Sequence, residues 1–428
     1  MNDLIKIAEE LNDLVVNNKI LLVKTEPEID DFTKVFSGKI LIYGENKIAT
    51  ISIKEKNEIV NLFFQLNETV FSEEMTVIFW NLKKFVSFFR FHLPKKEIYF
   101  KSKIVDLRLV ESFLDIKNSS PRSLNEAIKR LIPYLKNELA IKIHNKIHKP
   151  LSVNVIPAME NYTGIIDLRI NKYVYPSYEI EGQNFGRLNC SKAFENCITP
   201  MNMGDDVKDL LKLKSENDIF INFDFKHMEV SMLQYLTKDQ ALKEAMDEDD
   251  DLYKEIYKSI FKQLCDTEEK RNLIKTLFLP IMFGMCSEEG SQISVVRSLI
   301  KTNFKTAWEF LEYHQEQSKI NPIVKDYFGR PRSFDDKHLK VRGFLIQSAS
   351  AVFCQEKLIC LYNSIDNYGN LVYSIHDGYI VVANKNNADK VIANGLKALQ
   401  SESYMCEGLQ LKVSCYLGSK LNKMIQIK

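Results

Sequence analysis

The stretch Ile219-Phe-Ile-Asn-Phe-Asp224 is a run of β-forming residues that ends in an acid, and Leu371-Val-Tyr-Ser-Ile-His-Asp377 is a second such run. Apolar runs of this kind predict buried strands. Carboxylates at the ends of adjacent strands can share two divalent cations about 3.5 to 4 Å apart, which activate an attacking oxygen and neutralise a leaving phosphate. Each acid taken alone is more often a turn or helix-capping residue.

Between the two runs, the segment Arg271-Asn-Leu-Ile-Lys-Thr-Leu-Phe-Leu-Pro-Ile-Met-Phe-Gly284 predicts a helix over residues 268–283. Side chains four residues apart share one helix face, so the segment carries a stripe that is basic at its start and apolar at its end: Arg271, Lys275, Leu279 and Phe283. Such a stripe can hold a triphosphate and stack against a base. In isolation, an amphipathic helix with two solvated cations is the simpler interpretation.

Length and charge limit the possibilities. The chain has 428 residues, with 58 Lys and Arg against 57 Asp and Glu, for a net charge of +1. At about 150 residues per domain, this length predicts roughly three units. Near-neutrality does not by itself indicate nucleic acid, so any basic surface must be local. With 45% hydrophobic and 27% charged residues, a mainly disordered chain is excluded.

The cysteines point to a reducing compartment. None of the eight lies before Cys190 and none forms a C-x-x-C pair, so neither a zinc knuckle nor a disulfide framework is indicated. The sequence also lacks a secretory apolar segment and any continuous apolar stretch of about 18 residues. We therefore expect a cytoplasmic protein with no membrane partner.

Patterning divides the chain into three parts. Short β-rich runs at residues 19–23, 39–43, 48–53 and 76–80, with helical stretches at 56–65 and 107–113, predict a small α/β unit over residues 1–117. A turn at 117–123 and the capping signal of Ser123 and Glu126 predict a helix to about Ile147, within a connector over residues 118–155.

The third part, residues 156–428, carries the two acidic runs. Strands are predicted at residues 173–180 and 218–225, helices at 229–261 and 344–365, and a hairpin at 367–370. Two strands are expected to flank His376-Asp377. The acidic run 247–251 is interpreted as a solvated loop or a helix N-terminus.

The order of these motifs resembles that of family A DNA polymerases, the bacterial polymerase-I-like enzymes. The family's D-Y-S-Q-I-E-L-R motif is similar to Asp224-Phe-Lys-His-Met-Glu-Val-Ser231, and its R-x-x-x-K-x-x-x-F-x-x-x-Y-G motif to residues 271–284. Its H-D-E motif is similar to His376-Asp377-Gly378. Residues 174–188, 329–332 and 347–351 resemble its V-H-T-S-Y…T-G-R-L-S-S, G-R-R and Q-G-T-A-A segments. The resemblance begins near Tyr162 and extends to the end of the chain.

This resemblance implies a multidomain α+β and α/β fold. A right-hand polymerase with palm, fingers at about residues 232–340 and a reduced thumb at 118–155 would follow a small RNase-H-like α/β domain. The implied function is template-directed addition of dNTPs to a primer 3′ end on primer-template DNA, with two Mg²⁺ ions and Mn²⁺ as an alternative.

The resemblance also assigns roles to single residues. Asp224, Asp377 and the backbone carbonyl of Phe225 would bind the metal ions, and Arg271 and Lys275 would hold the triphosphate. Glu229 would lie under the sugar and exclude a 2′-hydroxyl. The other residues expected at the dNTP are His227, Tyr253, Leu279 and Phe283. Those expected at the DNA are Arg187, Gln347, His376, Arg330 and Arg332.

Several positions depart from the family pattern. Phe283 lacks the usual tyrosine hydroxyl and cannot hydrogen-bond Glu229, so we expect weaker positioning of that glutamate. Leu279 removes an aromatic ring that Phe278 could replace on a rotated helix, and Pro280 should kink the helix. Gly378 replaces a third carboxylate, a loss that the activity is expected to survive.

In the front third, Val23-Lys-Thr-Glu26 and Asn81-Leu-Lys-Lys-Phe85 resemble two motifs of the family's 3′–5′ exonuclease domain. Lys24 and Phe85 then stand where metal-binding aspartates would be, and neither side chain binds a cation. We expect a degenerate domain without proofreading; an unrelated α/β domain is the alternative.

The short thumb predicts weak grip on DNA and a need for a processivity or replisome partner, and the compact form suggests a phage or other mobile-element replicase. Two other functions stay open. The first is a non-catalytic, polymerase-derived nucleic-acid-binding scaffold, motivated by Gly378, Leu279 and Phe283. The second is a primer-making or RNA-synthesising enzyme, which would need to use rNTPs despite Glu229.

Overall fold

The computed structural model describes residues 20–28, 37–44, 47–53, 76–83, 85–86, 103–114, 124–180, 186–190, 198–200, 204–247, 251–285, 288, 290–335 and 337–427. The helix predicted at residues 56–65 and the turn predicted at 117–123 lie outside these ranges.

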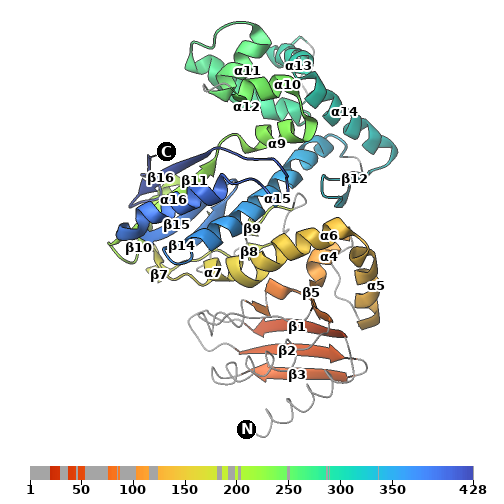
Figure 1. Cartoon of the computed structure of the whole chain (residues 1–428), viewed down its shortest axis with the longest axis vertical. Helices are drawn as coiled ribbons and strands as arrows, with labels where there is room; N and C mark the ends of the chain where they lie inside the picture. The colour runs from red at the N-terminus through yellow and green to blue at the C-terminus, as the bar shows by residue number, and fades with distance from the viewer. Residues whose placement is uncertain are drawn as a thin grey trace.

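A central antiparallel sheet has the strand order β14-β15-β11-β16-β17 (Figure 1). β11 pairs with β15 on one side and with β16 on the other, which explains why its sequence is a nearly continuous apolar run. The strand predicted at residues 218–225 is confirmed, as are the strands on either side of His376-Asp377. The bounds are β11 (Asp218–Phe225), β14 (Gly369–Ile375), β15 (Gly378–Asn384), β16 (Val413–Gly418) and β17 (Ile425–Gln426).

Both faces of this sheet are covered. Phe223 packs in one core with α15 (Lys340–Ile365) and α16 (Ala388–Leu399), whereas Phe220 packs in another with β6 (Ile165–Asp167) and β10 (Leu211–Leu213). Among the described helices, α15 alone is long and apolar enough to cross a membrane, but 83% of its most apolar window is buried inside the protein. We therefore interpret α15, predicted at 344–365, as the core helix of the sheet.

A lobe of helices stands above the sheet (Figure 1). The helical region predicted at 229–261 is confirmed but is divided into α9, α10 and α11, and the helix predicted at 268–283 is α12. Pro280 lies in the last turn of α12, and the helix ends two residues after it, at Met282. The lobe consists of α9 (Met228–Thr237), α10 (Gln240–Asp247), α11 (Leu252–Phe261), α12 (Glu268–Met282), α13 (Gln292–Asn303) and α14 (Lys305–Ile320).

The helical connector differs from its prediction. The expected single helix to Ile147 is interrupted after α5 (Leu124–Leu135), because Asn137 caps a new helix by accepting a hydrogen bond from the Ala140 N–H. From there the chain stays helical to Glu160 and passes through Pro150 and through the expected boundary at 155–156. Its parts are α6 (Glu138–Ile143), the π-helical η1 (His144–His148) and η2 (Leu151–Val155), and α7 (Ile156–Glu160).

The N-terminal unit is a mixed sheet in the order β3-β2-β1-β4-β5, below the connector helices in Figure 1. β1 is parallel to β4, and β4 to β5, whereas β2 and β3 are antiparallel. The strands predicted here from β-rich runs are confirmed, as is the helix predicted at 107–113. The bounds are β1 (Ile20–Glu28), β2 (Ser37–Gly44), β3 (Lys47–Ile53), β4 (Thr76–Phe79), β5 (Lys103–Asp106) and α4 (Leu107–Leu114).

Two local predictions are wrong. The turn at residues 367–370 joins α15 to β14 and is not a hairpin, because the turn residues follow a helix rather than a strand. The single strand predicted at 173–180 is two short strands, β7 and β8, separated by Pro176. The remaining short elements are β7 (Lys172–Tyr173), β8 (Tyr178–Glu179), β9 (Asn189–Cys190), α8 (Asp205–Asp209), β12 (Ile323–Lys325), β13 (Pro331–Ser333) and η4 (Lys385–Asn387).

A buried ion pair gives a test of the fold. Arg330 Nε lies 2.7 Å from Asp326 Oδ2, and both side chains are at most 1% exposed. Removing the charge of a buried partner costs about 3–5 kcal/mol, so Asp326→Asn should lower the thermal unfolding midpoint by about 5 °C or more. Lys420→Met breaks a half-exposed pair with Asp209 and is the control, expected to shift the midpoint by about 1 °C at most. Equal midpoints for the two variants would contradict this prediction.

Candidate active site

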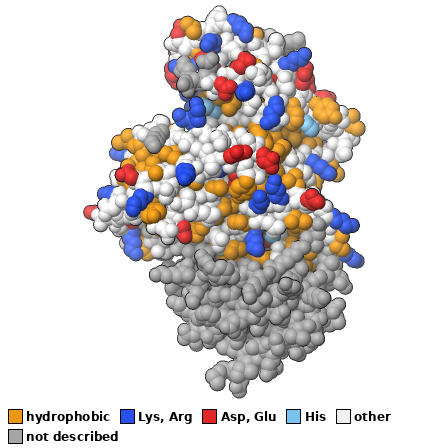
Figure 2. All heavy atoms as spheres, in the orientation of Figure 1, with side chains coloured by type: hydrophobic (Ala, Val, Ile, Leu, Met, Phe, Trp, Pro, Cys, Tyr) orange, Lys and Arg blue, Asp and Glu red, His pale blue; other side chains and the backbone are white. Residues whose placement is uncertain are grey.

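A cleft of about 1160 Å³ lies where the C-terminal end of β11 meets the helical lobe. Its walls come from distant parts of the chain: β11, β16, helices α9, α11, α12 and α15, and the turn between β14 and β15. Figure 2 shows acidic side chains near the centre of one face of the molecule, with basic side chains above and below them.

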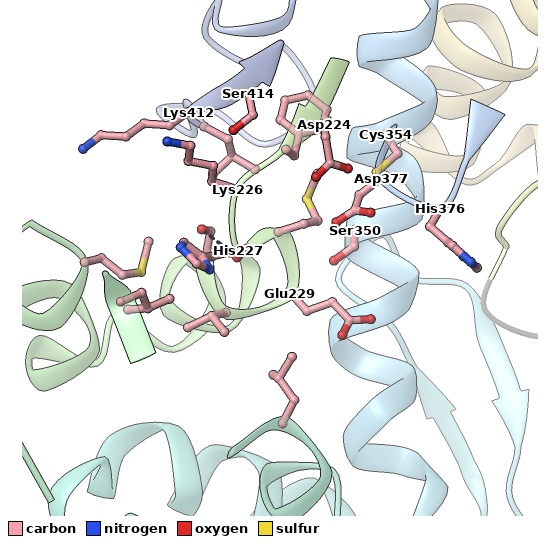
Figure 3. A pocket seen from close by; sticks show the side chains of 18 of the residues that line it. Asp224, Lys226, His227, Glu229, Ser350, Cys354, His376, Asp377, Lys412 and Ser414 are labelled. Carbon is pink, nitrogen blue, oxygen red and sulfur yellow. Dashed lines mark hydrogen bonds between the residues drawn. The ribbon is translucent and has the colours of Figure 1, made fainter. Parts of the chain in front are cut away.

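Strand pairing brings the two predicted acids together. Asp224 lies opposite Gly378 in the β11–β15 ladder, and Asp377 directly precedes Gly378. The Phe225 N–H donates to the Asp377 carbonyl at 3.3 Å, which ties the end of β11 to the turn. The carboxylates of Asp224 and Asp377 point toward one another (Figure 3). Burial and, next, the charge of Asp377 raise the pKa of Asp224 to about 6, and burial also raises the pKa of Asp377.

Both acids lie beside sharp turns. His376 (φ 53°) precedes Asp377, and His227 (φ 55°) follows Asp224 by three residues. A left-handed backbone is unfavourable for a residue with a side chain and often marks functional sites. A Cβ added at Gly378 would lie 3.1 Å from Asp224 Oδ1, so the glycine leaves space beside that carboxylate.

The donor atoms beside the acids limit how a metal could bind. Among the described residues there is no group of three or more His, Cys, Asp or Glu that could hold a metal ion. Asp224 and Asp377 supply two hard carboxylates, a number that suits Mg²⁺ or Mn²⁺ when phosphate oxygens complete the shell. The ring of Phe225 is buried against Phe353 and Tyr379, which fixes the backbone that carries the predicted carbonyl ligand.

Glu229 is held from two sides. It lies in the first turn of α9, where its Oε1 accepts from Arg187 Nη2 at 2.6 Å and from Gln347 Nε2 at 3.2 Å. The structure thus brings together three residues expected at the primer terminus and the sugar. Phe283 was expected to leave Glu229 poorly positioned, but these two donors hold the carboxylate without it.

The stripe on α12 faces the cleft along most of its length, because Arg271, Lys275 and Leu279 all line it. Arg271 is engaged by acids: its Nε and Nη2 lie 2.9 and 2.8 Å from Asp251 Oδ2, and its Nη1 lies 3.1 Å from Glu268. Lys275 is exposed and has no hydrogen-bond partner among the described residues. Lys275 is therefore the cation of the stripe that is free to meet an anion.

The apolar end of the stripe is only partly as expected. Phe278 cannot replace the missing aromatic ring at Leu279, because it is fully buried with its ring edge-on to Phe304 at 5.4 Å. Phe283 is the C-cap residue of α12 and lies next to Gly343, where an added Cβ would be 3.9 Å from its ring. Phe283 does not line the cleft.

His227 and Tyr253 form a second wall. Their rings meet edge to face at 5.3 Å, and both line the cleft. Burial lowers the pKa of His227, which favours its neutral form. Asp251 caps α11 by accepting from the Tyr253 N–H, and this confirms a helix N-terminus in the acidic run 247–251.

Of three predicted DNA contacts, one lies beside the acids and two lie outside the cleft lining. His376 lines the cleft but points away from Asp377 (Figure 3). Arg330 is buried, paired with Asp326 and bonded to the Ser348 carbonyl at 3.1 Å, so its guanidinium does not reach the cleft surface. Arg332 lies on β13 and donates to the Pro331 carbonyl at 2.7 Å, also outside the cleft lining.

Sequence reasoning missed other residues of the site. Asp251 binds Arg271 across a separation of twenty residues, which no local pattern reveals. Lys226 and Lys412 also line the cleft and extend side by side, away from the carboxylates (Figure 3). Lys226 lies two residues after Asp224 and could have been noticed from that position, whereas Lys412 reaches the site only because β16 pairs with β11.

Comparison with known proteins finds one matching family and a similar solved structure. The sequence profile of DNA polymerase family A matches residues 139–423. The POL domain of Pol1 from M. smegmatis, solved in complex with DNA primer-template and dNTP, has a similar structure. The TM-score is 0.77 at 11% sequence identity, over 97% of this chain and 98% of that one. No curated protein sequence matches the chain.

The profile covers two thirds of the chain, and its span includes Asp224, the α12 stripe and Asp377. The family match places the chain among the nucleotidyltransferases of the DNA-directed DNA polymerase class. The chain belongs to DNA polymerase family A.

Repulsion between the two carboxylates predicts an effect on stability without metal. Burial and the charge of Asp377 raise the pKa of Asp224 to about 6, so the folded protein binds a proton more tightly than the unfolded chain does. The stability that this bound proton contributes is lost as the pH rises through about 6. In EDTA at pH 8, Asp377→Asn should unfold at the same temperature as the wild type or a higher one, and the gain should shrink at pH 5. Asp366→Asn changes an exposed acid and is the control. A clearly less stable Asp377→Asn at pH 8 would contradict the repulsion.

Proposed function

We propose that this polymerase adds dNTPs to a primer 3′ end under the direction of a template, by a two-metal mechanism and without proofreading. One observation carries the proposal: Asp224 and Asp377 lie together at the end of the central sheet, in the cleft that the Arg271–Lys275 face of α12 also lines. Phosphoryl transfer needs this combination, because cations must be held at the reacting oxygens while the triphosphate charge is neutralised.

The elements suggest a right-hand layout. The central sheet with α15 and α16 would be the palm, and the helices of residues 232–340 would be the fingers. The helical segment 118–155 would be a reduced thumb. These assignments are supported by the fold likeness and by the position of the cleft between sheet and lobe.

Within the cleft, bound divalent ions would supply charge neutralisation and an activated primer hydroxyl. Asp224 and Asp377 would hold them, with the Phe225 carbonyl as a further ligand. Lys275 would meet the triphosphate directly, and Arg271 would join it while remaining oriented by Asp251. Tyr253 and His227 would form the wall beside the nucleotide.

Glu229 would select the sugar. Its carboxylate is held in place by Arg187 and Gln347, so a 2′-hydroxyl would collide with a side chain that cannot easily move aside. Arg187 and Gln347 would in turn present donors to the primer terminus and the minor-groove edge, whose acceptors are largely independent of sequence. The M. smegmatis domain binds DNA primer-template and dNTP, which supports these partners.

The N-terminal unit would be a degenerate, RNase-H-like exonuclease domain. Parallel β1, β4 and β5 with antiparallel β2 and β3 support this interpretation. Phe85 is buried against Phe79 at 4.9 Å, so the position aligned with a metal-binding aspartate serves the core. A phage or mobile-element origin, a cytoplasmic location and a processivity partner remain proposals from the sequence.

Primer extension tests the proposed synthesis. With Mg²⁺, four dNTPs and a primed template, the wild type should extend the primer. Lys275→Met should lower kcat/KM for dNTP about 100-fold or more, because it removes a charge aimed at the transferring group. Lys270→Met is the matched control on the same helix, since Lys270 pairs with Asp266 at the surface, and it should stay within about twofold.

Three results would contradict the proposed synthesis. The first is binding of primer-template without extension by the wild type, the behaviour of a scaffold. The second is extension that prefers rNTPs, the behaviour of an RNA-synthesising enzyme. The third is full extension by Asp377→Ala.

Lack of proofreading is tested separately. A labelled primer with a mismatched 3′ nucleotide should stay intact with the enzyme in Mg²⁺ or Mn²⁺ without dNTPs, because Lys24 and Phe85 cannot bind a cation. The same assay with Asp377→Asn excludes removal by reversal of synthesis. Metal-dependent shortening by both proteins would show an active exonuclease site.

A further inference from the structure

The buried phenol of Tyr178 closes the edge of the strand that carries Asp377. Tyr178 lies on β8 and is fully buried. Its hydroxyl donates to the Ser374 carbonyl at 2.8 Å and accepts from the Ser374 N–H at 2.8 Å. Both main-chain groups of Ser374 are thus satisfied by a single side chain, three residues before Asp377.

β14 needs this support, because it is an edge strand. It pairs with β15 on one side, and its register shifts between Leu371 and Tyr373. After the shift, only the short stretch Tyr373–Ile375 pairs with β15 before the turn that contains His376 in its left-handed conformation. Buried edge groups without a partner would favour local opening of this stretch.

The backbone of Tyr178 is itself fixed by charged groups. Its N–H donates to Glu160 Oε1 at 2.8 Å, and its carbonyl accepts from Lys83 Nζ at 2.6 Å. Lys83 and Glu160 form an ion pair of 2.9 Å, with side chains 13% and 12% exposed. Lys83 belongs to the N-terminal unit and Glu160 ends α7, so three parts of the chain meet at one tyrosine.

We propose that Tyr178 is a positioning residue for Asp377, and that Lys83 makes the N-terminal unit part of this support. The path runs from Lys83 and Glu160 to the Tyr178 backbone, through its ring to Ser374, and along β14 to the turn. It gives the N-terminal unit a role in synthesis that needs no exonuclease chemistry. The inference rests on the proposed role of Asp377 as a metal ligand.

Tyr178→Phe tests the path, and Tyr373→Phe is a close control. Tyr373 is also fully buried and lies on β14, but its hydroxyl has no hydrogen-bond partner among the described residues. Tyr178→Phe should lower kcat about tenfold or more, because small displacements of reacting groups are costly. The KM for dNTP should change by less than about threefold, because the contacts on α12 are untouched. Tyr373→Phe should match the wild type.

Hydrogen exchange without metal or substrate gives a second readout that does not depend on activity. In Tyr178→Phe, peptides covering Ser374 to Asp377 should exchange about tenfold faster or more, while those of α12 stay unchanged. Tyr373→Phe should leave both regions as in the wild type. Faster exchange at unchanged kcat would overturn the positioning role. Exchange at the turn equal to that of Tyr373→Phe would overturn the path itself.

Lys83→Met tests whether the N-terminal unit contributes to the positioning of Asp377. It also replaces Tyr178→Phe as the test if that variant does not fold. It should change kcat and exchange at the turn in the same direction, and its effect should largely disappear in the double variant with Tyr178→Phe. Lys129→Met, at an exposed position on α5, is its control. Effects of Lys83→Met equal to those of Lys129→Met would overturn the role of the N-terminal unit. If the wild type makes no DNA, the proposed function fails while the exchange result still reports the coupling.

Discussion

The pairing of β11 with β15 is the constraint on which the rest of this structure depends. It places Asp224 opposite Gly378 and therefore beside Asp377, so two like charges share a half-buried space. A slip of one residue would turn every side chain of β11 to the other face of the sheet and separate the pair. Both faces are buried under different cores, and that burial holds the register against the repulsion.

Other features of the structure stabilise Asp224 and Asp377 in this position. The left-handed residues His227 and His376 flank the acids, and such backbone persists only when the surrounding structure determines it. Tyr178 seals the edge of β14, and α15 closes one face of the sheet. The N-terminal unit adds to this support through Lys83, which donates to the Tyr178 carbonyl.

The near-zero net charge of the chain also holds within the cleft. We expected basic groups to be concentrated locally, and Arg187, Lys226, Arg271, Lys275 and Lys412 do line the cleft. The cleft supplies their counter-charges as well: Glu229 pairs with Arg187, and Asp251 with Arg271. Such pairs orient the guanidinium groups, and they leave Lys275 as the exposed cation of the α12 stripe. Net charge is therefore a poor guide to what a folded cleft can bind.

The sequence by itself determined the local elements and the chemistry they carry. Apolar runs ending in acids predicted β11 and β14, and the spacing of Arg271, Lys275 and Leu279 predicted the face of α12 that lines the cleft, because strand and helix periods are local properties. Only the tertiary structure decided which groups meet. Arg271 with Asp251, Glu229 with Arg187 and Gln347, and Tyr178 with Ser374 join residues 20 to 196 positions apart. Tertiary packing also assigned Arg330 and Phe278 to the interior. Burial and long-range pairing depend on how whole elements pack, and no local pattern records that packing.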